Sequence, residues 1–146
     1  MMKEKFGRIL ENAHFNNWAS DWSLAQEIYS SFPDSYSLLT PFAYAYLEEL
    51  IRSTTSEYIK GHPKVSERRK TGARLIDLAI EENSNNDEYV GLLERARSYF
   101  VPSDITDSGD NRHGVSHGYL PPRFWTKESF EGLISLIGQI SPFSRF

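Results

Sequence analysis

The chain has 146 residues, no cysteine and a formal net charge of −4. This length fits one domain with a single core. The absence of cysteine excludes disulfides, thiolate zinc sites and cysteine nucleophiles, and the acidic balance leaves only a local basic patch for binding nucleic acid. No stretch has the apolar character of a signal peptide or the roughly 20 apolar residues of a membrane span. We therefore expect a cytoplasmic protein without membrane contact.

The predicted elements are all helical, because apolar residues recur at helical spacing and strict alternation is rare. Asp21 is expected to cap the second helix, and Pro33-Asp34-Ser35 to form a turn. Thr40-Pro41 is expected to start the third, since threonine is a good N-cap and proline fits the first helical position. Thr126 is expected to cap the last helix, which buries Phe130, Leu133, Ile134, Ile137 and Ile140. The expected ranges of the first five helices are 3–18, 22–32, 41–60, 66–82 and 87–100.

The predicted fold is all-α, a single-domain helical bundle over residues 1–146 with a short polar motif helix before the C-terminal helix. No repeat, low-complexity tract or linker to a second domain interrupts the chain. The polar motif helix is expected to end at Gly118, ahead of Pro121-Pro122.

Positive charge is concentrated in one segment, residues 60–74, where Glu67 is the single acid. Such a patch could contact the phosphates of RNA, which provide sequence-independent affinity. The alternative is a solvated helix start that pairs with the acidic residues of 81–94. The candidate RNA-binding residues are Lys60, Lys64, Arg68, Arg69, Lys70 and Arg74.

Residues 110–118 differ from the rest because their helical stripe is polar. At about 100° per residue, Asp110, His113, Gly114 and His117 fall at the positions that other helices use for the core. A helix with so little to bury stabilises itself poorly, and Gly114 costs it about another 1 kcal/mol relative to alanine. This polar face is therefore expected to line a cleft or a subunit interface.

Three interpretations of this segment remain open. His113 and His117 could share a metal ion, but a pair needs further ligands and no metalloprotease signature is present, so no metal or cofactor is expected. Arg112 and His117 could instead act on a phosphodiester, because arginine offers a fixed charged fork and histidine exchanges a proton near neutral pH. The third interpretation is a polar helix end with satisfied histidines.

The segment from Arg112 to His117 consists of an arginine, a polar residue, three further residues and a histidine. This pattern resembles the motif of HEPN domains (higher eukaryotes and prokaryotes nucleotide-binding). The fuller string, which begins at Asn111 and ends at Gly118, resembles an uncharacterised bacterial subgroup of these proteins. The resemblance is best over residues 108–140 and weaker over 41–60, where Glu48, Glu49 and Arg52 could form the polar face that fronts the motif.

The resemblance implies a helical bundle that forms a homodimer and a metal-independent endoribonuclease, in a toxin–antitoxin or anti-phage setting with a possible antitoxin or other protein partner. Arg112 and His117 would be catalytic, supported by Asn111, His113, Ser116, Glu48 and Glu49. Arg112 and His117 lie about 140° apart on an ideal helix, so a second subunit could complete the site. The alternative is a catalytically inactive HEPN-like module for dimerisation or partner binding.

Overall fold

The computed structural model describes residues 1–59, 70–100, 122 and 125–146. Every element in this part of the chain is helical, which confirms the all-α prediction. The predicted polar motif helix at 110–117 lies outside the described residues. In chain order the helices are α1 (Met2–Asn12), α2 (Ala19–Ser31), η1 (Pro33–Ser35), α3 (Tyr36–Arg52), α4 (Ser56–Ile59), α5 (Gly72–Glu82), α6 (Asp87–Arg97), η2 (Ser98–Phe100), α8 (Lys127–Ile140) and η4 (Ser141–Phe143).

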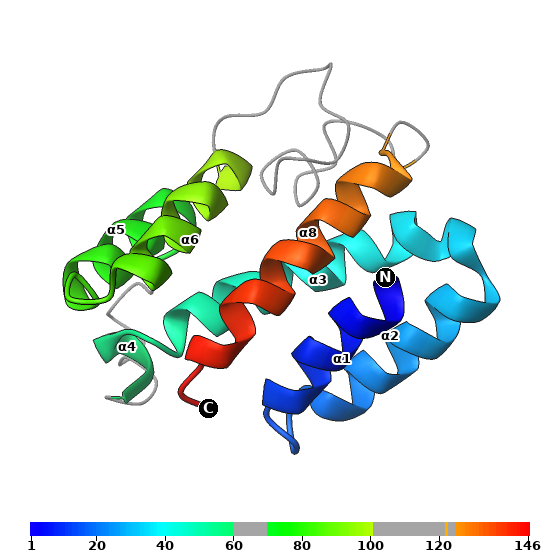
Figure 1. The fold of residues 1–146 in the computed structure, drawn as a ribbon, viewed down its shortest axis with the longest axis horizontal. Helices are drawn as coiled ribbons and strands as arrows, with labels where there is room; N and C mark the ends of the chain where they lie inside the picture. The colour runs from blue at the N-terminus through cyan, green and yellow to red at the C-terminus, as the bar shows by residue number, and fades with distance from the viewer. Residues whose placement is uncertain (60–69, 101–121, 123–124) are drawn as a thin grey trace.

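The two central helices are α3 and α8, which pack against each other and connect two outer pairs. In Figure 1, α1 and α2 lie on one side of α8, and α5 and α6 lie on the other. Helix α1 packs on α8 and α2, whereas α5 packs on α6 and α3. None of the helices in the described ranges combines the length and apolar character that a membrane span needs.

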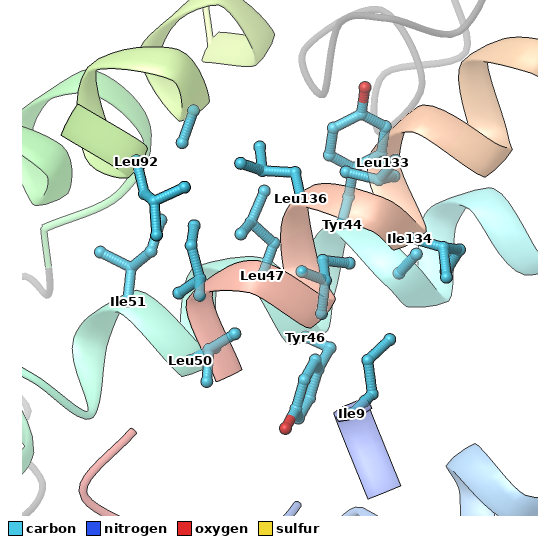
Figure 2. Packing of buried hydrophobic residues seen from close by; sticks show 14 of the residues in the cluster. Ile9, Tyr44, Tyr46, Leu47, Leu50, Ile51, Leu92, Leu133, Ile134 and Leu136 are labelled. Carbon is cyan, nitrogen blue, oxygen red and sulfur yellow. The ribbon is translucent and has the colours of Figure 1, made fainter. Parts of the chain in front are cut away.

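The core follows from the apolar stripes of α3 and α8. Leu47, Leu50 and Ile51 of α3 are fully buried, and in Figure 2 Leu47 lies beside Leu136 of α8, whereas Ile51 lies beside Leu92 of α6. Burying a side chain of this size contributes about 1.5–3 kcal/mol, so the pairing of α3 with α8 is a principal source of stability. All five residues expected on the buried face of the last helix are buried.

Aromatic side chains close the end of the core between α2 and α3. The ring of Trp22 lies 4.8 Å from that of Phe42 and 5.1 Å from that of Tyr46. Trp18 contacts the same two rings, at 5.8 and 5.0 Å. Edge-on and tilted pairs at these distances are favourable beyond the area they bury. Trp22 and Tyr46 therefore belong to the core, and Trp18 and Phe42 pack against it.

The first two predicted helix boundaries are wrong. Helix α1 ends at Asn12 rather than at residue 18, because Ala13 adopts an extended conformation. The chain then forms a turn in which the carbonyl of His14 accepts backbone hydrogen bonds from residues 17–19. This break brings Trp18 to the aromatic cluster. Helix α2 begins at Ala19, so Asp21 lies inside the first turn instead of capping it. An acidic residue there still interacts favourably with the helix dipole.

Thr40 and Pro41 lie inside α3 rather than at its start, which is a further correction. The helix begins at Tyr36, and the Thr40 hydroxyl donates a 2.7 Å hydrogen bond to the carbonyl of Tyr36. Proline lacks the N–H that would bond to the carbonyl one turn earlier, which makes this position costly. Leu39 and Ala43, on either side of Pro41, are buried, and their burial offsets that cost.

Helix α3 also ends earlier than predicted, at Arg52 rather than at residue 60. Three consecutive hydroxyls explain the end: Ser53, Thr54 and Thr55 donate to the carbonyls of Leu50, Ile51 and Arg52, at 2.6, 2.7 and 2.8 Å. Side-chain bonds of this kind compete with continuation of the helix.

Other boundaries agree with the sequence where a local cap fixes them. The side chain of Asn86 accepts from the backbone of Tyr89 at 3.1 Å and starts α6. Thr126 accepts from the backbone of Ser129 at 3.1 Å, which confirms the predicted cap of α8. Helix α5 instead starts at Gly72, later than the predicted residue 66.

Candidate functional site

The predicted catalytic and supporting residues of the motif lie outside the described residues. These are Arg112, His117, Asn111, His113 and Ser116, and they stay predictions. The same holds for four of the predicted RNA-binding residues, Lys60, Lys64, Arg68 and Arg69. The structure describes the remaining predicted site residues, Glu48, Glu49, Lys70 and Arg74, and brings three of them to one corner.

This corner lies where α3, α4 and the start of α5 meet, and its centre is Arg52. The Arg52 side chain is only 6% exposed although it carries a fixed charge. Its Nη1 donates to the Glu49 carboxylate at 3.3 Å, and its Nη2 donates to the Lys70 carbonyl at 2.8 Å. Its Nε approaches Glu57 Oε2 at 3.5 Å without the geometry of a hydrogen bond. We call Glu48, Glu49, Arg52, Glu57 and Lys70 the Arg52 cluster.

The carboxylates of the Arg52 cluster hold the backbone that leads into α5. Glu57 accepts from the backbone N–H of Lys70 at 3.0 Å, and Glu48 accepts from that of Gly72 at 3.1 Å. Gly72 has a φ of 57°, a left-handed conformation that only glycine adopts without strain. Glu48 and Glu49 therefore have an observed structural task, beside the supporting role that the resemblance implies.

The two described basic residues differ in what surrounds them. The Lys70 ammonium lies 3.9 Å from Glu57 and its side chain is half exposed. Arg74 is exposed on α5 and lines, together with Lys70, Asp77 and Glu81, an open hollow of about 380 Å³. A phosphate could reach both cations from solvent, although the two acids in the hollow reduce their positive potential.

The alternative interpretation of the basic segment, pairing with the acids of 81–94, can be followed only at Lys70 and Arg74, and no described ion pair joins either of these two to those acids. Glu82 accepts from the backbone and the hydroxyl of Ser56, both at 2.6 Å. Glu94 pairs with Arg97 at 3.1 Å, and Arg97 also pairs with Asp77 at 2.8 Å. Lys70 pairs with Glu57 instead.

The chain on either side of residues 101–121 is fixed by aromatic residues. The ring of Tyr99 lies 6.2 Å from that of Tyr44 on α3, and its hydroxyl lies beside Gly132 on α8. Trp125 is buried, and its backbone N–H donates to the carbonyl of Pro122 at 3.0 Å. Tyr44 lies one helical turn before Glu48 on α3. The chain before the motif-bearing segment is thus held against α3 and α8 by Tyr99, and the chain after it enters α8 through the buried Trp125.

Metal binding has no support within the described ranges, where no three histidine or carboxylate side chains gather around a common point. The histidine pair that could hold a metal belongs to the undescribed motif. Sequence reasoning noted Arg52 only as part of a polar helix face and missed Glu57. The Glu49 to Arg52 spacing of three residues, with Arg52 following two core residues, was the available indication.

Comparison with protein-family models, with curated proteins and with solved structures gives no match.

Proposed function

We propose that this protein is a metal-independent endoribonuclease that acts as a homodimer and uses Arg112 and His117. The observation that carries the proposal is the sequence of the motif, which has an arginine and two histidines in a polar segment that precedes the capped, buried helix α8. The all-helical architecture of the described residues and the packing of Tyr99, just before the motif-bearing segment, against α3 and α8 support it.

In the proposed mechanism, Arg112 binds the scissile phosphate and stabilises the charge that develops on its oxygens. The ribose 2′-oxygen loses its proton and attacks phosphorus, and the bond to the 5′-oxygen breaks as that oxygen gains a proton. His117, or its counterpart in the second subunit, acts as general base or general acid in these transfers. The products are a 2′,3′-cyclic phosphate and a 5′-hydroxyl.

Other residues would bind and orient the RNA. Asn111, His113 and Ser116 would contact the backbone or position the reacting groups, and Glu48 and Glu49 would support them from α3. Lys70, just before α5, and Arg74 on α5 are exposed at one hollow and would contact phosphates beyond the reacting one. Cleavage belongs to an anti-phage or toxin–antitoxin setting in this proposal, which follows from the resemblance alone.

The test is incubation of the purified protein with mixed RNA in EDTA, beside His117→Ala and Arg112→Ala. We expect cleavage by the parent with cyclic-phosphate ends. Each variant should lose at least about 100-fold, the usual effect of removing an acid–base group for His117 and a charge-stabilising donor for Arg112. His14→Ala is the matched control, since His14 lies at the end of α1 and contacts Phe15 and Phe146. Cleavage by His117→Ala at the parental rate would refute the mechanism.

A non-catalytic interaction module is the second candidate, and one observation favours it. Glu48 and Glu49 already serve the backbone of Gly72 and the guanidinium of Arg52, so the polar face of α3 has a structural use. If neither parent nor variants cleave RNA after any bound partner has been removed, this candidate replaces the ribonuclease.

A further inference from the structure

The surface formed by α2, η1 and the first half of α3 is acidic and has no cation of its own. Between Arg8 and Arg52 the sequence contains six aspartates and glutamates but neither lysine nor arginine. Asp21, Glu27 and Asp34 are exposed on α2 and η1, and none has a described cation within ion-pairing distance. Lys3 of α1 lines a shallow hollow with Glu27, on the flank of α2 that carries Gln26 and Ser30.

The same surface exposes large apolar side chains. Leu24 is 53% exposed, Phe32 69% and Leu38 78%. Leu24, Ile28 and Phe32 are spaced by four residues along α2, which places them on one flank of the helix. Leu38, Phe42 and Ala45 are spaced by four and three residues along α3, which places them on one face of that helix. We call Asp21, Leu24, Glu27, Phe32, Asp34 and Leu38 the hairpin surface.

The hairpin surface belongs to one rigid unit. The Trp22 and Phe42 rings join α2 to α3 at 4.8 Å, and both helices pack against η1. Three large apolar side chains that stay in contact with water lack the stabilisation that burial would give them. Exposed apolar residues bordered by charges of one sign typically mark a site of protein association.

Charge decides which class of partner fits. RNA and anionic lipid surfaces would be repelled by these three carboxylates, which pair with no cation among the described residues. A second copy that met this surface through a two-fold axis would bring the same three carboxylates of each subunit together, with no cation between them. A protein segment with apolar anchors bordered by lysine or arginine satisfies both features, because the apolar side chains bury Phe32 and Leu38 while the cations meet the carboxylates.

We propose that the hairpin surface is the docking site for a basic amphipathic segment of a partner protein. Phe32 and Leu38 serve as its apolar anchors, and Asp21, Glu27 and Asp34 orient the segment and speed its association. This site includes no residue of the motif, so the inference does not depend on the ribonuclease proposal and fails or stands separately from it.

The test uses a designed helical peptide whose leucine face is bordered by lysine, and a second peptide in which every lysine is replaced by glutamate. Binding is followed by calorimetry and by backbone amide shifts in the full chain. We expect the lysine peptide to bind, with shifts over α2, η1 and the start of α3, and with affinity that falls as salt is added. We expect no binding of the glutamate peptide.

Variants separate this surface from general attraction to an acidic protein. The double variant Phe32→Ser with Leu38→Ser should lower the affinity for the lysine peptide at least about tenfold. Phe15→Ser should leave that affinity unchanged, although Phe15 is 77% exposed. Affinity for the lysine peptide should fall further in the triple variant Asp21→Asn, Glu27→Gln and Asp34→Asn. It should fall less in the charge-matched triple variant Glu11→Gln, Glu81→Gln and Glu88→Gln. Circular dichroism checks that each variant keeps its helices.

Three outcomes would overturn the proposal. One is equal binding of the lysine and glutamate peptides, or binding of neither. Another is unchanged affinity in the Phe32→Ser and Leu38→Ser variant. The third is that sedimentation shows this variant to be a monomer where the parent is a dimer, because the surface would then join two copies of this chain.

Discussion

The guanidinium of Arg52 donates a 2.8 Å hydrogen bond to the carbonyl oxygen of Lys70, and this bond links the end of α3 to the chain that enters α5. Its other neighbours are the carboxylates of Glu49 and Glu57. A buried cation is costly unless it is paired, so the Arg52 cluster is stable only as a complete set.

Arg52→Met should therefore lower the free energy of unfolding by about 3 kcal/mol, because it leaves Glu49 without its cation, Glu57 with only the half-exposed Lys70, and the Lys70 carbonyl without its donor. Urea unfolding measures the loss. Arg97→Met is the matched control: Arg97 also binds two carboxylates, but it is 36% exposed, and its removal should cost less than about 1 kcal/mol. Equal losses in the two variants would show that burial does not set the contribution of Arg52.

Two buried tyrosines should respond in opposite ways to removal of the hydroxyl. The Thr54 hydroxyl donates to the Ile51 carbonyl, so the Tyr89 hydroxyl, 2.8 Å from it, must be the donor to Thr54. Tyr89→Phe should cost about 1 kcal/mol. The buried Tyr46 hydroxyl has no hydrogen-bond partner among the described residues, so Tyr46→Phe should stabilise the fold by about 1 kcal/mol. Destabilisation by Tyr46→Phe would point to a bound water that satisfies this hydroxyl.

The same tyrosines predict a loss of stability in alkaline solution. Burial raises the pKa of Tyr89 to about 12, and burial also raises the pKa of Tyr46 and Tyr29 above the ordinary value near 10. Between about pH 10 and 12 the unfolded chain loses these protons while the folded chain keeps them, so stability is complete below pH 10 and falls as pH rises. Each tyrosine contributes a slope of up to about 1.4 kcal/mol per pH unit.

Urea unfolding at a series of alkaline pH values measures that slope in the parent and in Tyr46→Phe. We expect a shallower slope in the variant, since one group with a raised pKa has been removed. Tyr58→Phe is the control at a half-buried tyrosine. A slope that is the same in all three proteins would mean that Tyr46 ionises as freely in the folded chain as in the unfolded one.

Elements set by local chemistry could be predicted from the sequence, and elements set by distant contacts could not. The cap of α8 by Thr126 depends on a residue three positions away, and the prediction is confirmed. The start of α3 was missed because Pro41 normally breaks a helix, and only the burial of its neighbours in the folded core reverses that preference.

The candidate site shows the same division. Glu48 and Glu49 lie on α3, within the predicted third helix, and both are half-buried. Their partners do not follow from spacing, because the backbone of Gly72 is 24 residues from Glu48 along the chain. The buried position of Arg52 likewise depends on how α4 and α5 return to the end of α3.

Two glycines should respond oppositely to alanine. Gly72→Ala places a side chain at a φ of 57° and should cost about 1–2 kcal/mol. Gly91 lies within α6, and an added Cβ would meet nothing within 4 Å, so Gly91→Ala should stabilise the fold by about 0.5–1 kcal/mol. Thermal unfolding of both variants tests the pair. A stabilising Gly72→Ala would contradict the left-handed conformation at the start of α5.

If α5 contacts RNA, removal of its two described cations should change the salt dependence of binding. Lys70→Gln with Arg74→Gln removes two charges that are accessible from solvent, so the slope of log affinity against log salt should become shallower by about 0.7 for each phosphate that is no longer neutralised. Fluorescence anisotropy with a single-stranded RNA measures the slope. The control is Lys3→Gln with Arg8→Gln on α1, which lies on the other side of α8 (Figure 1). Because both double variants lower the net charge equally, a general effect of charge would change both slopes alike, whereas binding of RNA to α5 makes only the first slope shallower.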